Sequence, residues 1–505
     1  MLNSFSFDPQ ENPSRIVAQA GRKKVEKLGI LLVLFSFATG CTVGPNYKRP
    51  PVDVPGGYRG AAPEPEAAKP ADEKAQPGQA AAQPQAAAQS LGDEKWFDVF
   101  QDKQLQELIR TALKNNYDVN IAAARILKAQ AQLGITRADQ LPTISAGAAG
   151  INGDIPRNKF VGNTETSVNA VGASFNWQLD FWGKYRRATE SARANLLAAR
   201  WGREYVVSTL VSDVAASYFQ LRALDLELEI SRRTLDARKQ SLKLTQTLVN
   251  GGATNMLDQR QAEVLVATAA ETIPDLERRI EQQENYLSTL LGSNPGPITR
   301  GLPLVEQPHP PQVPSGLPSS LLERRPDIRE AEEQLIAANA QIGVAKAAYY
   351  PDISLTATAG YASSALTSLF TGPAGFWALG GMITQPIFAG GRIKSGVKYS
   401  EAQKQEMLLT YQKTIQQAFR GVSDSLVAYQ KDREFREYQE QLNAAAEDSA
   451  RLSEVRYGGG RASYLEVLTN ETNHFNAEIG LAQARLNELL ALVDLYRNLG
   501  GGWQS

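Results

Sequence analysis

Two stretches of the chain repeat apolar or small residues at alternating steps of three and four positions. The first begins at Leu210 and ends at Val249, and the second runs from Leu465 through Leu468 to Tyr496. A seven-residue repeat of this kind is typical of helices that supercoil against neighbouring helices. We therefore expect both stretches to be helical, with the repeated positions buried.

Two proline-free segments are long enough to form unusually extended helices. Lys184 to Asn250 and Arg392 to Tyr457 each have about 66 residues, which corresponds to about 100 Å of helix. Such helices are too long for a globular domain. Glycine-rich turns allow each of them to reverse into a second helix, and these turns contain Gly251, Gly252, Gly458, Gly459 and Gly460. The pattern thus predicts two long helical hairpins.

An alternation with a period of two predicts strands near residues 143–151, 167–180, 352–361 and 376–388. The second of these is regular, since Val171 and each odd position up to Leu179 are apolar while the even ones are small or polar. The fourth is irregular and contains Pro386. One apolar and one small polar face over about ten residues is typical of membrane β-strands. On periodicity alone, a half-buried sheet of a soluble protein is the alternative.

The chain repeats itself with a nearly constant offset. LPTISAGAAG (141–150) matches YPDISLTATAG (350–360), and VSDVAASY (211–218) matches VSDSLVAY (422–429). We therefore divide the chain into a first structural repeat over 96–300, a proline-rich equatorial linker over 301–325 and a second repeat over 326–505.

Four strands per chain cannot close a barrel, and hydrocarbon does not tolerate open strand edges. The chain is therefore expected to share a barrel with copies of itself. Three copies give about twelve strands, an even number within the known range, and two copies giving about eight satisfy the same arithmetic.

The N-terminal region predicts a lipoprotein. Basic residues precede a short apolar run from Leu28 to Phe37, and small residues lead into Cys41, the only cysteine. We interpret 1–40 as a signal peptide and Cys41 as the lipid attachment site. A buried free thiol or a simple N-terminal anchor is the alternative. Residues 41–95 then form the acylated N-terminus and a Pro/Ala-rich tether.

Composition argues against catalysis and nucleic-acid binding. The chain has 53 Lys+Arg against 54 Asp+Glu, so it has no basic excess for nucleic acid. One cysteine and two histidines leave no thiolate metal cluster, and the sequence contains no motif of a hydrolase or a P-loop. We expect no enzyme activity, no metal and no cofactor apart from the covalent lipid.

Several motifs resemble the TolC-like outer-membrane factor family, in its efflux lipoprotein branch (NodT/OprM type). They are CTVGPNYKRP (41–50), LLERRPDI (321–328), AANAQIGVAKAAYYPDISLTATAG (337–360), PIFAGGR (386–392) and LYRNLGGGW (495–503). The resemblance implies a homotrimer with a shared 12-stranded outer-membrane β-barrel, a long periplasmic coiled-coil α-barrel and an equatorial belt. It also implies a lipid-anchored protein of the cell outer membrane.

The resemblance further implies partners and a gate. The partners are a periplasmic adaptor, which the glycine turns would contact, and an inner-membrane pump, typically of the proton-driven RND class. In the family the tip narrows after the second-half turn, where Leu465 falls at a hydrophobic ring and Glu466 at an acidic position. Thr469 stands where members often carry a second Asp. Taken without the family, Leu465 is a helix-packing residue and Glu466 a solvated one.

We therefore predict the outer-membrane channel of a tripartite efflux system, a passive exit duct for small toxic compounds or drugs. A conduit for protein secretion is the alternative with the same architecture. A periplasm-spanning structural lipoprotein without conductance is a further alternative, against which the alternating strands argue.

Overall fold

The computed structural model describes residues 42–59, 90–155, 164–308 and 318–503. The predicted signal peptide, Cys41 and most of the tether lie outside the described residues. No helix among the described residues is both long and apolar enough to cross a membrane.

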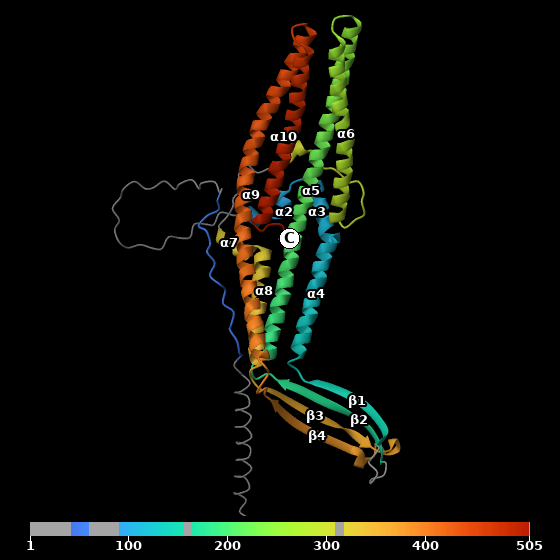
Figure 1. Cartoon of the computed structure of the whole chain (residues 1–505), viewed down its shortest axis with the longest axis vertical. Coiled ribbons are helices and arrows are strands. Elements are labelled where there is room, and N and C mark those ends of the chain that lie inside the picture. The colour runs from blue at the N-terminus through green and yellow to red at the C-terminus, as the bar shows by residue number, and fades with distance from the viewer. Residues whose placement is uncertain (1–41, 60–89, 156–163, 309–317, 504–505) are drawn as a thin grey trace, which may run out of the picture. The chain divides into compact units, whose positions relative to one another are not determined.

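Long helices account for most of the described chain (Figure 1). The two predicted extended helices are confirmed, and each contains 67 residues. The helices are α2 (Trp96–Val99), α3 (Lys103–Asn115), α4 (Tyr117–Ala138), α5 (Lys184–Asn250), α6 (Met256–Leu290), α7 (Pro318–Arg324), α8 (Pro326–Ala347), α9 (Arg392–Gly458) and α10 (Tyr464–Asn498), with short 3-10 turns at Leu91–Asp93, Leu304–Glu306, Leu366–Ser368 and Gly372–Ala374.

The chain divides into two compact units, and each unit draws on both repeats. Unit 1 comprises Met1–Arg49, Ala129–Leu196 and Gln334–Met407, and unit 2 comprises Pro50–Lys128, Leu197–Glu333 and Leu408–Ser505. Each repeat therefore gives a pair of strands to unit 1 and a helical hairpin to unit 2.

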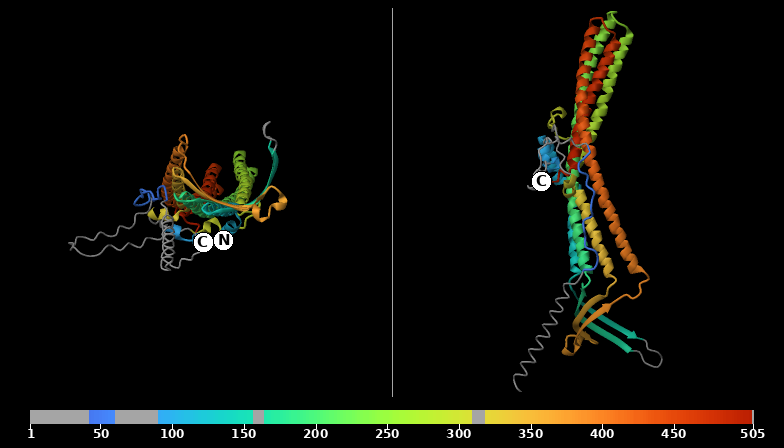
Figure 2. Two further views of the ribbon diagram at one scale, coloured as in Figure 1. Left: turned by 90° about the horizontal axis from the view of Figure 1, so that it is seen from below. Right: turned by 90° about the vertical axis from the view of Figure 1, so that its left-hand side faces the viewer.

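Unit 1 contains a curved four-stranded sheet (Figure 2). The strands are β1 (Thr143–Ile155), β2 (Thr164–Leu179), β3 (Asp352–Ser363) and β4 (Gly375–Thr384). They pair in the order β1-β2-β3-β4, with every neighbour antiparallel. The pairing of β2 with β3 joins the two repeats, with Gly172 opposite Gly360 and Trp177 opposite Leu355.

The fourth strand is shorter than the alternation predicts. It ends at Thr384, whereas we expected it to continue to Phe388. Pro386 has no N–H to donate to a neighbouring strand, so the ladder cannot extend past it. The side-chain amide of Gln385 instead donates to the Tyr349 carbonyl at 3.1 Å.

In unit 2, α5 runs beside α6 and α9 beside α10, as both figures show (Figures 1 and 2). All four of these helices carry buried apolar residues, and α10 packs on α6. The buried stripe expected along α10 is confirmed at its C-terminal half, where Leu486, Leu489, Val493 and Tyr496 are buried.

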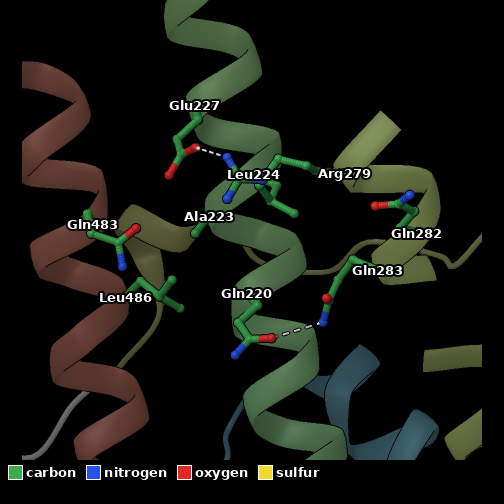
Figure 3. A pocket seen from close by; sticks show the side chains of 9 residues that line it. All are labelled: Gln220, Ala223, Leu224, Glu227, Arg279, Gln282, Gln283, Gln483 and Leu486. Carbon is green, nitrogen blue, oxygen red and sulfur yellow. Dashed lines mark hydrogen bonds and ion pairs between the residues drawn. The ribbon is translucent and has the colours of Figure 1, made fainter. Parts of the chain in front are cut away.

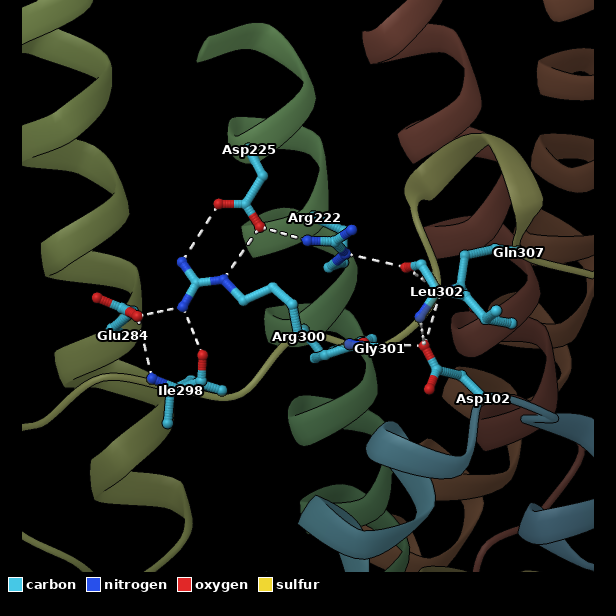
Figure 4. A network of polar contacts seen from close by, with 10 residues as sticks. Asp102, Arg222, Asp225, Glu284, Ile298, Arg300, Gly301, Leu302 and Gln307 are labelled. Atoms are coloured by element: carbon cyan, nitrogen blue, oxygen red, sulfur yellow. Dashed lines mark hydrogen bonds and ion pairs between the residues drawn. The ribbon is translucent and has the colours of Figure 1, made fainter. Parts of the chain in front are cut away.

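A polar network fixes the linker between the repeats within unit 2 (Figure 4). Asp102 caps α3 and accepts hydrogen bonds from the Tyr218 hydroxyl (2.8 Å), the Leu302 N–H (2.9 Å) and the Gln307 amide (2.9 Å). Burial alone would raise the pKa of Asp102, but these hydrogen bonds lower it below its usual value. Arg222 of α5 also donates to the Leu302 carbonyl at 2.9 Å. The linker is thus tied to α3 and α5.

Candidate channel gate

The turn of each hairpin has the same backbone geometry. The Gly252 N–H donates to the Val249 carbonyl at 3.0 Å, and the Gly460 N–H donates to the Tyr457 carbonyl at 2.9 Å. Gly252 and Gly460 have φ values of 75° and 70°, a region that suits glycine after a helix C-terminus. Of the other predicted turn glycines, Gly251 and Gly459 lie in the turns and Gly458 is the last residue of α9.

Beyond the turns, residues of all four helices form an apolar cluster. Its buried members are Ala262 of α6 with Tyr464 and Val467 of α10, and Leu242, Tyr457 and Leu468 pack against them. The rings of Tyr457 and Tyr464 meet edge to face with centroids 5.3 Å apart. The cluster therefore joins the first hairpin to the second.

Leu465 lies outside this cluster. Its side chain is 57% exposed within the single chain, whereas Tyr464 is 2% exposed. Within the single chain, Leu465 does not begin the buried stripe of α10 as expected, because Tyr464 enters the cluster and one residue of helix turns the next side chain away by about 100°. Its neighbour one turn on, Thr469, donates its hydroxyl to the Leu465 carbonyl at 2.8 Å.

Glu466 is paired across the turn. An Arg456 Nη1 donates to its carboxylate at 2.8 Å, and Arg456 belongs to α9 while Glu466 belongs to α10. Both side chains are partly exposed, so the pair contributes little to stability. It does place a positive charge beside the predicted acidic position. The sequence reasoning missed Arg456, although a basic residue before a glycine turn with an acid after it is a signal for such a pair.

Farther along the helices, the two hairpins face each other across a polar groove (Figure 3). Its volume is about 290 Å³. The Gln283 amide donates to the Gln220 side chain at 3.1 Å, and Arg279 approaches Glu227 at 3.7 Å. Burial raises the pKa of Glu227, while Arg279 lowers it.

Comparisons with known proteins decide the family. The model of the family described as outer membrane efflux protein matches residues 108–293, within the first repeat, and 317–501, which covers the end of the linker and most of the second repeat. The chain belongs to the outer membrane efflux protein family.

Individual relatives match most of this chain over most of their own length. It is 36% identical to the antibiotic efflux pump outer membrane protein ArpC of Pseudomonas putida, over 83% of this chain and 87% of that protein. It is 32% identical to the probable outer membrane lipoprotein SilC of Salmonella typhimurium, over 94% and 99%. The open state of the Neisseria gonorrhoeae MtrE outer membrane channel has a TM-score of 0.81 and 30% identity, covering 92% of this chain and 99% of that one.

These findings confirm the predicted fold class of four strands and long helices in two repeats, the architecture of trimeric outer-membrane channels. This outer membrane efflux protein is an outer-membrane channel of an efflux pump, with a large periplasmic helical part, and works with other pump components. It is a channel and not an enzyme. Among the described residues, no cluster of three or more His, Cys, Asp or Glu side chains could hold a metal ion.

In unit 1, the segment that follows Cys41 is docked, which means that hydrogen bonds hold it against the rest of the unit. The Val43 N–H donates to the Trp182 carbonyl at 3.1 Å, and Arg187 donates to the Asn46 side chain at 2.6 Å. The Asn339 amide donates to the Pro45 carbonyl at 2.9 Å. Since Arg187 is on α5 and Asn339 on α8, the segment contacts both repeats. Cys41 itself lies outside the described residues.

Proposed function

We propose that the chain is the exit duct of a tripartite efflux pump and that it is gated at the hairpin turns by Leu465, Glu466 and Thr469. The observation that carries the gate is the exposure of Leu465 beside the buried Tyr464. A leucine that its own chain leaves exposed, at the end of a channel helix, is available for a constriction. Copies of it around a symmetry axis would exclude water and ions.

The duct requires more than one chain. Within the described residues, the outer edges of β1 and β4 pair with no strand, and β4 exposes Phe376, Trp377 and Leu379. In hydrocarbon each unpaired backbone group costs several kcal/mol, so strand edges pair between copies. Three copies give a closed barrel of about twelve strands.

The acidic ring belongs to the same gate. Threefold symmetry would gather three Glu466 carboxylates, which attract cations and reject anions. Their pairing with Arg456 offsets part of this charge. Thr469 is neutral and bonds within its own helix, so in this proposal the gate has a single acidic ring.

The proposed partner proteins are inferred from the position of the glycine turns and from the described relatives. We assign Gly251, Gly252, Gly458, Gly459 and Gly460 to the surface that the periplasmic adaptor contacts, with an inner-membrane pump of the RND class behind it. The cargo is small toxic compounds, by similarity to a relative described as an antibiotic efflux pump component. Cys41 carries the lipid that adds outer-membrane anchoring, a role supported by the docked segment that follows it.

Single-channel conductance in planar bilayers tests the gate. Leu465→Ala should raise the conductance, because it removes apolar volume at the constriction. The matched control is Leu257→Ala, since Leu257 occupies the equivalent place at the start of α6 and is 63% exposed. An unchanged conductance in Leu465→Ala, or an equal rise in both variants, would contradict the proposal.

A further inference from the structure

Helices α5, α6 and α10 of unit 2 meet around one buried arginine. Arg238 of α5 is 3% exposed, and its Nη1 donates to the Leu265 carbonyl of α6 at 2.9 Å. Its guanidinium lies 5.2 Å from the centre of the Phe475 ring of α10. Its Nε has no hydrogen-bond partner among the described residues. Arg238 thus contacts both hairpins.

A carboxyl group of the second hairpin lies within the electrostatic reach of Arg238. Glu471 is on α10, one turn before Phe475, and its Oε2 is buried without a hydrogen-bond partner in the described part of the chain. The charges acting on it are Glu454 from α9 and Arg238 from α5. The Tyr464 hydroxyl is also near, and its pKa is raised chiefly by burial. From α6, the group at this cluster is the uncharged Leu265 carbonyl.

Burial is the main cause that raises the pKa of Glu471, to about 7. Repulsion from Glu454 adds to the rise, and attraction by Arg238 opposes it. A carboxyl group whose pKa lies near neutral pH, at a cluster shared by both hairpins, changes its charge at a contact between them.

We propose that Glu471, with Arg238 and Glu454, is a proton-sensitive clasp that holds the two hairpins together at the tip. The inference rests on the proposed gate, since it assigns a regulation to the same end of the channel. When Glu471 is protonated, its buried carboxyl is neutral and does not repel Glu454. When it is ionised, the half-buried Glu471 adds a second negative charge to that of the exposed Glu454, with Arg238 as the countercharge.

The direction of the pH effect follows from the raised pKa. A carboxyl whose pKa is higher in the packed state favours that state at low pH, and this contribution is lost as the pH rises through the raised value. The window extends from the ordinary glutamate pKa of 4.5 to about 7. Acid conditions should therefore hold the tip closed, and conditions above neutral pH should loosen it.

The test is the conductance of the full-length channel in planar bilayers as a function of pH. The wild type should show a conductance that rises with pH, with a midpoint inside the window from 4.5 to about 7. Glu471→Gln, which is neutral at every pH, should remain in the low-conductance state throughout. Glu454→Gln should move the midpoint to lower pH. The matched control is Glu447→Gln, an exposed acid on α9, which should behave as the wild type.

An infrared measurement follows the proton itself. In the wild type, the infrared band of the protonated carboxyl should disappear between about pH 6 and about pH 8, because the pKa of Glu471 is about 7. This band should be absent in Glu471→Gln. If Glu471→Gln does not assemble, Glu454→Gln carries the test through its lower midpoint.

The results separate the two proposals. If Leu465→Ala raises the conductance at fixed pH but the pH dependence persists in Glu471→Gln, the clasp is wrong and the gate stands. If the wild type shows no pH dependence and no titrating carboxyl band, the clasp is also overturned. If Leu465→Ala changes nothing while the pH dependence is lost in Glu471→Gln, the clasp stands and the constriction lies elsewhere.

Discussion

Tyr464 and Leu465 are adjacent in α10 and opposite in exposure, with 2% of Tyr464 and 57% of Leu465 accessible. The tyrosine ring packs on Ala262 and Val467, whereas the leucine faces away from this cluster. The two residues therefore have different roles at the start of the same helix. One residue holds the hairpins together, and the other is available for the proposed constriction.

This separation predicts different stability effects for two neighbouring substitutions. Tyr464→Ala should destabilise the tip by about 3–5 kcal/mol, the usual range for truncating a large aromatic core residue. Leu465→Ala should change the stability by no more than about 0.5 kcal/mol, as is usual for an exposed side chain. Chemical denaturation, together with limited proteolysis near the turns, measures both. A loss of several kcal/mol in Leu465→Ala would make it a packing residue after all.

The Arg456–Glu466 pair predicts opposite changes in ion selectivity. Glu466→Gln should reduce the cation preference of the channel, because it removes the carboxylates from the ring. Arg456→Gln should increase that preference, because it leaves Glu466 without its countercharge. Neither should change the stability by more than about 1 kcal/mol, since the pair is partly exposed. Reversal potentials in a salt gradient give the selectivity.

A control for this prediction comes from the first repeat. Asp258→Asn alters the acid at the equivalent position of α6 and should leave the selectivity unchanged. An equal effect of Asp258→Asn and Glu466→Gln would mean that selectivity reflects the charge of the whole tip and not a ring at Glu466.

The turn geometry predicts that Gly460 is less replaceable than the glycine before it. Gly460 has a φ of 70°, so Gly460→Ala should cost about 1–2 kcal/mol through the left-handed conformation. Gly459 has no such φ, and Gly459→Ala should cost less. The rate of proteolytic cleavage at the turn measures the difference. Equal rates in the two variants would show that the turn tolerates a side chain at Gly460.

The sequence predicted the long helices well because glycines mark their ends and no proline interrupts them. Asn250 ends α5 as expected, and α9 continues only one residue past Tyr457 to Gly458. The phase of α10 near the turn was harder to predict, because steps of three and four fit either Tyr464 or Leu465 as the first buried position. The choice depends on Ala262, which lies about 200 residues away in the chain.

The contacts that charged side chains make between helices could not be predicted from the sequence pattern either, because they also depend on residues far apart in the chain. Arg238 stands out as an interruption of an apolar stripe, but its contacts with Leu265 and Phe475 depend on how separate helices pack. In the same way, Pro386 in an alternating segment indicates an irregular strand, yet the last paired residue, Thr384, is set by the register with Asp352.

The docked segment at 42–49 makes a prediction about the lipid anchor. Mass spectrometry of the mature protein should show an acylated N-terminal Cys41, and Cys41→Ser should lose the acyl groups. Arg187→Gln should release the segment, because it removes the 2.6 Å bond to Asn46, and hydrogen exchange at residues 43–47 should rise. Acylation should persist in Arg187→Gln, since the signal for it lies upstream of the docked residues. An unmodified Cys41 thiol, or an N-terminus upstream of it, would contradict the anchor. Unchanged exchange in Arg187→Gln would show that the bonds from Val43 to Trp182 and from Asn339 to Pro45 suffice to hold the segment.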